Sequence, residues 1–149
     1  MNKMINHNGQ LALICDLDGT LAKMHDRSPY DFKKVYNDHV NESVRLVVSS
    51  LHETLGASIV FCSGRDDNCF ELTDRWIREK AGFADFKLLM RKTGDKRKDA
   101  IIKKEIYLSD IFPFYNLQFV FDDRHQVCEM WHHELGLNLF RVGDPNAKF

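Results

Sequence analysis

The chain has 149 residues, of which 29% are charged and 44% are hydrophobic, and its formal net charge at pH 7 is −1. This length fits one domain with a proper core and is too short for a second large module. With positive and negative charges in balance, the net charge gives no indication for or against binding to nucleic acid. The first ten residues lack the apolar stretch of a signal peptide, and no segment reaches the ~20 apolar residues of a membrane span. A reducing cytoplasm is the expected setting.

Apolar, β-rich runs alternate with stretches of helical periodicity along the chain. Strands are predicted at about 11–16, 58–62, 86–90, 117–121 and 138–142. Apolar residues at 3.6-residue spacing predict helices at about 44–55, 70–81, 95–108 and 127–135, with Asn41 as a possible N-cap of the first. This order predicts an α/β fold with a mostly parallel sheet and right-handed crossovers. Residues 1–10 are expected to form a flexible lead, and residues 23–40 a small lid or substrate loop.

Two aspartates stand on alternate residues directly after the first apolar run, Leu11 to Cys15. Asp16 and Asp18 belong to the string Asp-Leu-Asp-Gly-Thr-Leu, in which a glycine turn follows the acid pair. An acid pair at a strand end is typical of metal-assisted chemistry on a phosphate, and an acidic turn that only caps the strand is the plainer alternative. Ligands of parallel α/β sheets bind beyond the carboxyl ends of the strands, which is where these acids fall.

Two further strand ends and one helix carry polar groups of the same kind. The second predicted strand ends in Ser63-Gly64-Arg65, and the fourth ends in Asp122-Asp123-Arg124. By themselves, Ser63 and Gly64 fit an ordinary loop, and the two aspartates fit a helix cap. Asp99 and Lys103 stand four apart on a predicted helix, where an exposed pair would be worth only about 0.3–0.5 kcal/mol.

In order and character, these four groups resemble the signature motifs of the haloacid dehalogenase (HAD) superfamily of phosphohydrolases. The resemblance implies a HAD-like three-layer fold and an aspartyl-phosphate mechanism that depends on Mg²⁺. Asp16 would be the nucleophile and Asp18 the general acid and base, while Ser63, the backbone N–H of Gly64 and Lys103 would contact the phosphoryl group. Mg²⁺ would be bound by the carboxylates of Asp16 and Asp122, by the backbone carbonyl of Asp18, and by Asp123 through water or as a support.

Superfamily members often enclose small substrates beneath an inserted cap domain, and no interval in this chain is long enough for one. An uncapped site suits a substrate too large to enclose, such as a nucleic-acid end or a protein. Residues 87–104 contain eight Lys or Arg against two Asp. Such a run fits a solvated face, and near a phosphate site it also fits a track for an anionic chain.

A closer resemblance extends beyond the catalytic positions. Three regions of the chain are similar to the phosphatase domain of bacteriophage polynucleotide kinase/3′-phosphatases: residues 16–24 with Arg27 and 29–31, residues 94–99 with 103–106, and residues 122–127 with 129–131. This resemblance implies removal of 3′-phosphates from DNA or RNA ends, with Arg27 and Arg65 as phosphate-binding arginines and Asp99 as an acid beside the lysine. It also implies homo-oligomers, and a phage origin would place the protein in the host cytoplasm. The chain lacks the Gly-x-x-x-x-Gly-Lys-Ser/Thr loop of the kinase domain, so no 5′-kinase activity is expected of it.

Two alternatives remain open from the sequence. A HAD phosphatase for mononucleotides or another small phosphate monoester would share every core motif. A phosphoacceptor signalling module would also use an Asp, metal-binding acids and a Lys. In that class the acceptor lies on a middle strand after the acid pair, whereas the Asp-x-Asp here follows the first strand.

Overall fold

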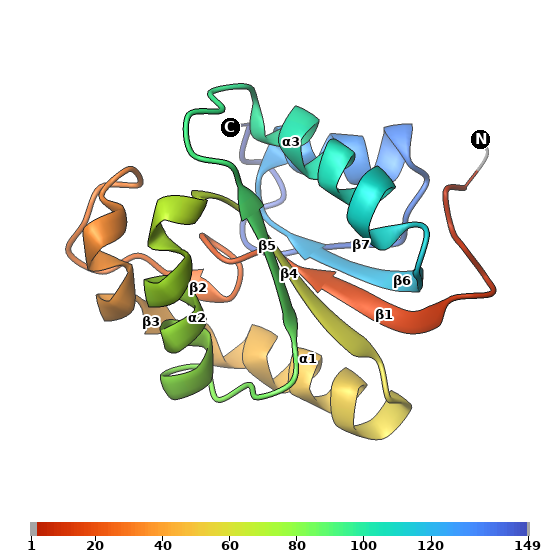
Figure 1. Ribbon diagram of the computed structural model, residues 1–149, viewed down its shortest axis with the longest axis horizontal. Coiled ribbons are helices and arrows are strands. Elements are labelled where there is room, and N and C mark those ends of the chain that lie inside the picture. The colour runs from red at the N-terminus through yellow and green to blue at the C-terminus, as the bar shows by residue number, and fades with distance from the viewer. Residues whose placement is uncertain (1–2, 149) are drawn as a thin grey trace.

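The computed structural model describes residues 3–148, and its centre is a parallel five-stranded sheet with the order β5-β4-β1-β6-β7 (Figure 1). The strands are β1 (Gln10–Cys15), β4 (Ser58–Asp66), β5 (Lys87–Arg91), β6 (Tyr115–Asp122) and β7 (Leu139–Arg141). A separate antiparallel pair is formed by β2 (Ala22–Lys23) and β3 (His39–Val40). The five predicted strands are confirmed, and the largest difference is that β4 continues to Asp66 instead of ending at 62.

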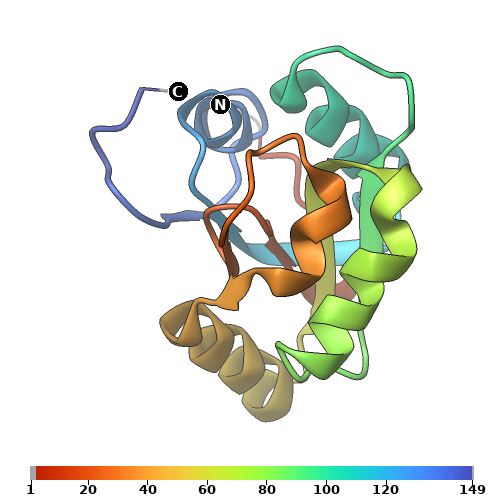
Figure 2. The same cartoon turned by 90° about the vertical axis from the view of Figure 1, so that its left-hand side faces the viewer.

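Helices cover both faces of the sheet, as Figures 1 and 2 show. One face packs on α1 (Glu42–Leu55) and α2 (Phe70–Glu79). The other face packs on α3 (Asp99–Ile106) and α4 (His125–Glu129). Helices α3 and α4 each continue into a π-helical turn, Tyr107–Ile111 and Met130–Glu134 respectively. Successive side chains of a strand point to opposite faces, so Leu13 joins the first apolar cluster and Ile14 the second. The predicted three-layer α/β fold is therefore confirmed. No helix within residues 3–148 combines the length and apolar character needed to cross a bilayer.

Two helix starts differ in detail from the prediction. The helix predicted from residue 95 begins only at Asp99, because Arg91 donates hydrogen bonds to the carbonyl oxygens of Asp95 (2.8 Å) and Arg97 (2.6 Å) and holds this stretch as a loop. Asn41 does occupy the N-cap position of α1, but its side chain donates to the carbonyl oxygen of Thr20 at 3.0 Å instead of capping the helix. The Arg91 contacts are local, whereas the contact of Asn41 with Thr20 joins segments 21 residues apart.

Met4 and Ile5, in the predicted flexible lead, pack against the layer of α3 and α4. The backbone N–H of Met4 donates to the carbonyl oxygen of Leu135 at 2.9 Å, and the Tyr107 hydroxyl donates to the carbonyl oxygen of Met4. Met4 and Ile5 also pack on the apolar cluster of that layer. These contacts give Met4 and Ile5 defined partners, the flexibility of the lead stays a prediction, and residues 1–2 lie outside the described residues.

Residues 23–40 form a compact flap at the carboxyl edge of the sheet. A 3-10 helix, η1 (Phe32–Asn37), packs on α2, and the chain then returns through β3. The Tyr36 hydroxyl donates to Glu79, and the Trp76 indole N–H donates to the carbonyl oxygen of Asp38 at 2.8 Å. These contacts give the flap a defined position beside the ends of β1 and β4.

Strand β1 lies at the point where the strand order reverses. The chain passes from β1 to β4 and β5 on one side, and later places β6 and β7 on the other. The loops that leave β1 and β6 therefore diverge, and such a crevice is where ligands bind in open parallel sheets. Asp16 follows β1 directly, Ser63 lies near the end of β4, and Asp122 is the last residue of β6.

Candidate active site

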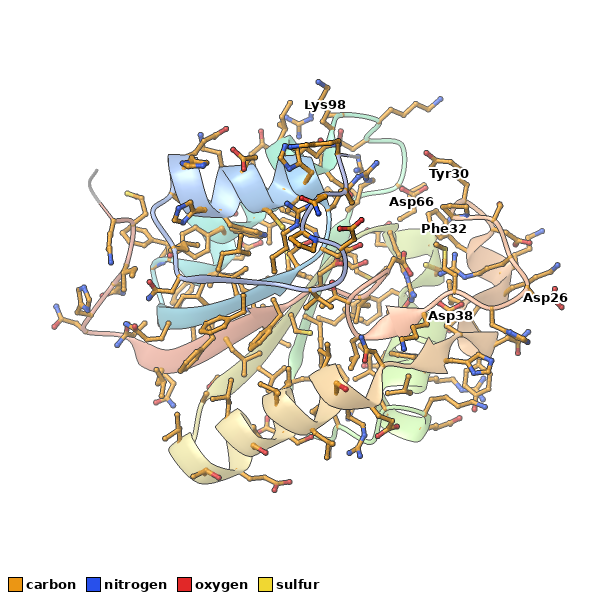
Figure 3. All side chains as sticks on the ribbon, turned by 180° about the vertical axis from the view of Figure 1, so that it is seen from behind. Asp26, Tyr30, Phe32, Asp38, Asp66 and Lys98 are labelled. Atoms are coloured by element: carbon orange, nitrogen blue, oxygen red, sulfur yellow. The ribbon has the colours of Figure 1, made fainter. Side chains whose placement is uncertain are left out.

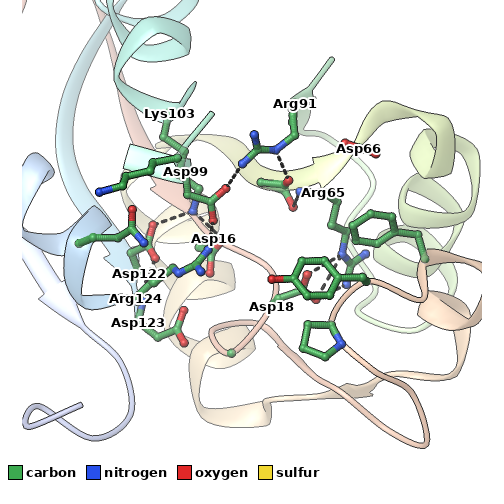
Figure 4. A pocket seen from close by; sticks show the side chains of 18 of the residues that line it. Asp16, Asp18, Arg65, Asp66, Arg91, Asp99, Lys103, Asp122, Asp123 and Arg124 are labelled. Carbon is green, nitrogen blue, oxygen red and sulfur yellow. Dashed lines mark hydrogen bonds and ion pairs between the residues drawn. The ribbon is translucent and has the colours of Figure 1, made fainter. Parts of the chain in front are cut away.

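A pocket of about 800 Å³ opens at this crevice (Figure 4). Its walls come from the carboxyl ends of β1, β4 and β6, from the start of α3 with the loop before it, and from the flap. All of the predicted site residues except Arg27 line the pocket. The topology thus brings together side chains from four separate parts of the sequence.

Lys103 joins two of the predicted acids at the base of the pocket. Its Nζ lies 2.8 Å from Oδ1 of Asp16 and 2.9 Å from Oδ2 of Asp122, and its side chain is 2% exposed. Burial lowers the pKa of Lys103, but the charges of Asp122 and Asp16 outweigh it and raise the pKa well above its usual value. The plainer interpretation of Lys103, as half of an exposed pair with Asp99, is therefore wrong.

Backbone and side-chain donors fix Asp122 in place. Its Oδ1 accepts the backbone N–H groups of Asp123 (2.9 Å) and Arg124 (3.4 Å), and its Oδ2 accepts the indole N–H of Trp131 at 3.1 Å. The residue is completely buried. Such a network holds the carboxylate in one orientation and offsets part of the cost of burying its charge.

The acids at the base of the pocket suit a hard divalent cation. Carboxylate oxygens of Asp16, Asp122 and Asp123 all lie within 4.8 Å of one another. Burial, reinforced by the neighbouring charge of Asp122, raises the pKa of Asp16 well above its usual value, so a further positive charge would stabilise its carboxylate. Oxygen donors of this kind, together with substrate phosphate, are the ligands that Mg²⁺ prefers. These three side chains therefore fit the predicted Mg²⁺ site.

The carboxylate of Asp18 lies outside this cluster, between two arginines. Its Oδ1 accepts hydrogen bonds from Nη2 of Arg27 (2.8 Å) and Nη2 of Arg65 (2.7 Å). Burial alone would raise the pKa of Asp18, but the charges and hydrogen bonds of Arg65 and Arg27 outweigh it and lower the pKa. Asp18 is therefore ionised in the free protein. The backbone carbonyl remains its expected contribution to the metal.

A residue that the sequence did not single out, Asp38, holds both arginines from behind. Arg27 donates to its two oxygens at 2.8 Å each, and Nη2 of Arg65 donates to Oδ2 at 3.0 Å. The side chains of all three residues are fully buried. Two buried arginines require a buried counter-charge, but the flap carries three aspartates and the sequence gives no reason to prefer this one.

Arg27 and Arg65 thus have a different setting from the one expected. The sequence predicts both as phosphate-binding residues, whereas each guanidinium is buried and paired with Asp18 and Asp38. Arg65 lines the pocket and Arg27 does not. In this arrangement, the first effect of the two arginines is to orient Asp18.

Asp99 at the start of α3 holds a second pair of arginines. Its Oδ1 lies 2.5 Å from Nη2 of Arg91, and its Oδ2 lies 2.7 Å from Nη1 of Arg124. Nε of Arg91 also donates to the carbonyl oxygen of Gly64 at 2.9 Å. Both arginines line the pocket and were absent from the predicted site, although each stands at the end of a predicted strand.

The strand end that carries Ser63 is bulged. Ser63 pairs with Met90 and Asp66 with Arg91, so Gly64 and Arg65 are extra residues in β4. A bulge re-aims side chains at the end of a strand. Here it leaves Ser63 buried at the base of the pocket and directs Arg65 towards Asp18.

A HAD-like fold with an Asp-x-Asp pair at the switch point, a buried lysine and a second acid pair defines a phosphatase of the HAD type. A family model described as the polynucleotide kinase PNKP phosphatase domain matches residues 10–146. The chain therefore belongs to the family of polynucleotide kinase phosphatase domains, and it is a phosphatase enzyme. The alternative of a phosphoacceptor signalling module is wrong.

Relatives of this chain are longer proteins. A bifunctional polynucleotide kinase/RNA ligase of Autographa californica nuclear polyhedrosis virus is 40% identical over 121 residues, which are 80% of this chain and 17% of the viral protein. Two solved structures of Pnkp1/Rnl/Hen1 complexes, one described as an RNA repair complex, contain a chain that is 37% and 39% identical, respectively. Their TM-scores are 0.89 and 0.87, and the matches cover 99% and 94% of this chain and 46% and 49% of those chains. The present chain spans less than half of each relative.

Gly19 provides a first test of the acid cluster. It adopts φ +83°, and a Cβ there would overlap the Asp123 carboxylate, whereas Gly82 has φ +80° with no atom within 4 Å of a Cβ. Both Gly→Ala changes incur left-handed strain of about 1–2 kcal/mol, but only Gly19→Ala displaces a cluster acid. We expect Gly19→Ala to lose at least about tenfold in phosphatase activity, since misplacing a reacting group by 1 Å has effects of this size or more. Phosphate release and thermal unfolding of both variants measure this, and equal activities would argue against a role for Asp123.

Proposed function

We propose that this domain removes the 3′-phosphate from DNA or RNA ends and leaves a 3′-hydroxyl, with Mg²⁺ as cofactor and an aspartyl-phosphate at Asp16 as intermediate. The observation that carries this proposal is a single pocket that combines the buried Asp16–Lys103 pair with a rim of exposed basic residues, Lys96, Arg97 and Lys98. Such a rim suits a polyanion, whose charges it would neutralise. Membership of the polynucleotide kinase phosphatase family supports the same substrate class.

The first step is attack of Asp16 on the phosphorus. Lys103 and the Thr20 hydroxyl, which donates to Oδ2 of Asp16 at 3.0 Å, hold the carboxylate in position. A bond forms between an Asp16 oxygen and phosphorus, and the bond between phosphorus and the 3′-oxygen breaks. Lys103 offsets the charge of the transferred group. Mg²⁺ held by Asp16, Asp122 and Asp123 would supply further neutralisation of the phosphate charge.

Ser63 and Gly64 contact the phosphoryl oxygens in this mechanism. The Ser63 oxygen accepts the backbone N–H of Arg65 at 3.2 Å, which leaves its own hydroxyl hydrogen to donate. Preorganised donors of this kind stabilise charge that develops in the transition state.

Asp18 transfers the protons. In the first step the departing 3′-oxygen takes a proton from Asp18, and in the second Asp18 accepts a proton from the water that attacks the phosphorus and releases inorganic phosphate. One residue serves both steps by microscopic reversibility. The arginine pair stabilises the carboxylate that the second step requires.

The lowered pKa of Asp18 gives the pH dependence a definite sign. Because Asp18 is ionised in the free enzyme, the proton for the first step enters with the substrate, whose second phosphate pKa is about 6. Raising the pH removes this proton and adds nothing to Asp18. We therefore expect kcat/KM to fall about tenfold per pH unit above about pH 7. A profile from pH 5.5 to 8.5 measures this, and a flat or rising profile would contradict the acid role of Asp18.

The direct test is phosphate release, with Mg²⁺, from an oligonucleotide that carries a 3′-phosphate. DNA and RNA versions, 3′-dTMP and a 5′-phosphorylated oligonucleotide serve as comparisons. We expect release only from 3′-ends and a higher kcat/KM for the oligonucleotides than for 3′-dTMP. A preference for the mononucleotide would replace this proposal with the small-substrate alternative, and a preference for the 5′-end would overturn the assignment to 3′-ends.

A further inference from the structure

One wall of the active-site pocket has no part in the mechanism above. It consists of Met24, Pro29, Tyr30 and Phe32 from the flap, and it lies across the pocket from the loop that carries Lys98 (Figure 3). Tyr30 is 82% exposed and Met24 is 44% exposed. An apolar wall beside a phosphate site is unlike the rest of its lining, which is polar and charged.

Tyr30 has no partner among residues 3–148. Within this range its hydroxyl makes no hydrogen bond, and its ring contacts no other aromatic ring and no cation. Apart from Tyr30, the most exposed large apolar side chain among residues 3–148 is Phe114, which is 61% exposed and lies at the opposite end of β6 from the pocket. Tyr30 therefore presents an exposed aromatic ring, without a stacking partner among residues 3–148, at the mouth of the pocket.

The backbone presents this ring in a defined way. Tyr30 follows Pro29 in a turn that closes with a hydrogen bond from the N–H of Asp31 to the carbonyl oxygen of Ser28 at 3.1 Å. Nη1 of Arg27 donates to the same carbonyl at 3.3 Å, while its Nη2 binds Asp18. One guanidinium therefore sets the position of both the acid–base residue and the turn that carries Tyr30.

We propose, on the basis of the proposed function, that Tyr30 stacks on the nucleobase of the 3′-terminal nucleotide and thereby positions its phosphate at Asp16. A nucleobase is planar, has two apolar faces and is joined to the phosphate through one sugar, so it matches an aromatic wall next to a phosphate site. Base–aromatic stacking tolerates any base. Stacking on Tyr30 would therefore hold the terminal nucleotide whatever its base.

The test uses two oligonucleotides that differ only at the 3′-phosphorylated residue, which carries a base in one and is abasic in the other. We expect Tyr30→Ala to raise KM for the base-bearing substrate about tenfold and for the abasic substrate less than about twofold, with kcat unchanged. Tyr30→Phe keeps the ring and should match the wild type. Phe114→Ala, which removes an exposed ring outside the pocket, should have no effect on either substrate.

Two results would overturn stacking: equal losses on both substrates, which would mean that Tyr30 only supports the flap, or no loss on either. Failure of the proposed function is a separate result, because the wild type would then release no phosphate from any 3′-end. In that case, fluorescence anisotropy of the same two labelled oligonucleotides with Asp16→Asn decides the question. If Tyr30 stacks on the base, Asp16→Asn should bind the base-bearing oligonucleotide more tightly than the abasic one. The double variant Asp16→Asn/Tyr30→Ala should bind the two equally. The proposal fails if either expectation is not met.

Discussion

Asp16→Asn is expected to reduce phosphate release by at least about 10³-fold, because an amide cannot form the phosphorylated intermediate. The side chain keeps its size, and the change removes one of three crowded negative charges, so the protein should remain folded. Phosphate release in the presence of Mg²⁺ measures the first effect, and thermal unfolding measures the second.

The matched control for this variant is Asp110→Asn. Asp110 is exposed and lies outside the pocket, in the π-helical turn after α3. It should retain full activity and stability. Activity of Asp16→Asn within tenfold of the control would rule out covalent catalysis by Asp16 and with it the proposed mechanism.

Lys103→Met is expected to destabilise the fold by about 3–5 kcal/mol and to abolish activity. Removal of Lys103 leaves Asp16 and Asp122 buried and close together without their shared cation. Denaturant unfolding measures the free energy of unfolding. A divalent cation would replace part of the missing charge, so Mg²⁺ should raise the unfolding midpoint of Lys103→Met more than that of the wild type.

The adjacent lysine offers the same substitution in a different setting. Lys104 is 40% exposed and pairs at 2.8 Å with Glu134 on the surface. Lys104→Met should change the free energy of unfolding by less than about 1 kcal/mol, the typical range of exposed ion pairs. Similar losses for the two variants would show that the Asp16–Asp122 site does not depend on the buried cation.

The fold and the chemical centre of the site could be predicted because they depend on local patterns. Alternation of apolar strands and helices is enough to indicate a parallel α/β sheet, and the carboxyl ends of its strands meet at one edge whatever the loops do. Asp16, Ser63 and Asp122 stand at or near the carboxyl ends of apolar strands, so their presence in one pocket follows from the topology.

The charge partners could not be predicted in the same way. Lys103 stands four residues after Asp99, which favours an exposed helix pair, yet it pairs with two acids from other strands. Asp99 binds Arg91 and Arg124 instead. The chain offers many acids and bases, and burial and geometry, which sequence spacing does not contain, select among them.

The sequence by itself therefore determined the class of fold and the place of the acid pair that contains the proposed nucleophile, since a short motif after a strand places both acids without help from the rest of the chain. Only the tertiary structure decided how Asp18 is held, because Arg27 and Asp38 come from the flap and Arg65 comes from the end of β4. The same holds for the place of Tyr30, whose turn hydrogen-bonds the arginine that binds Asp18. Side-chain pairing at the pocket joins residues far apart in the chain, and the physical cost of burying charge fixes which of them pair.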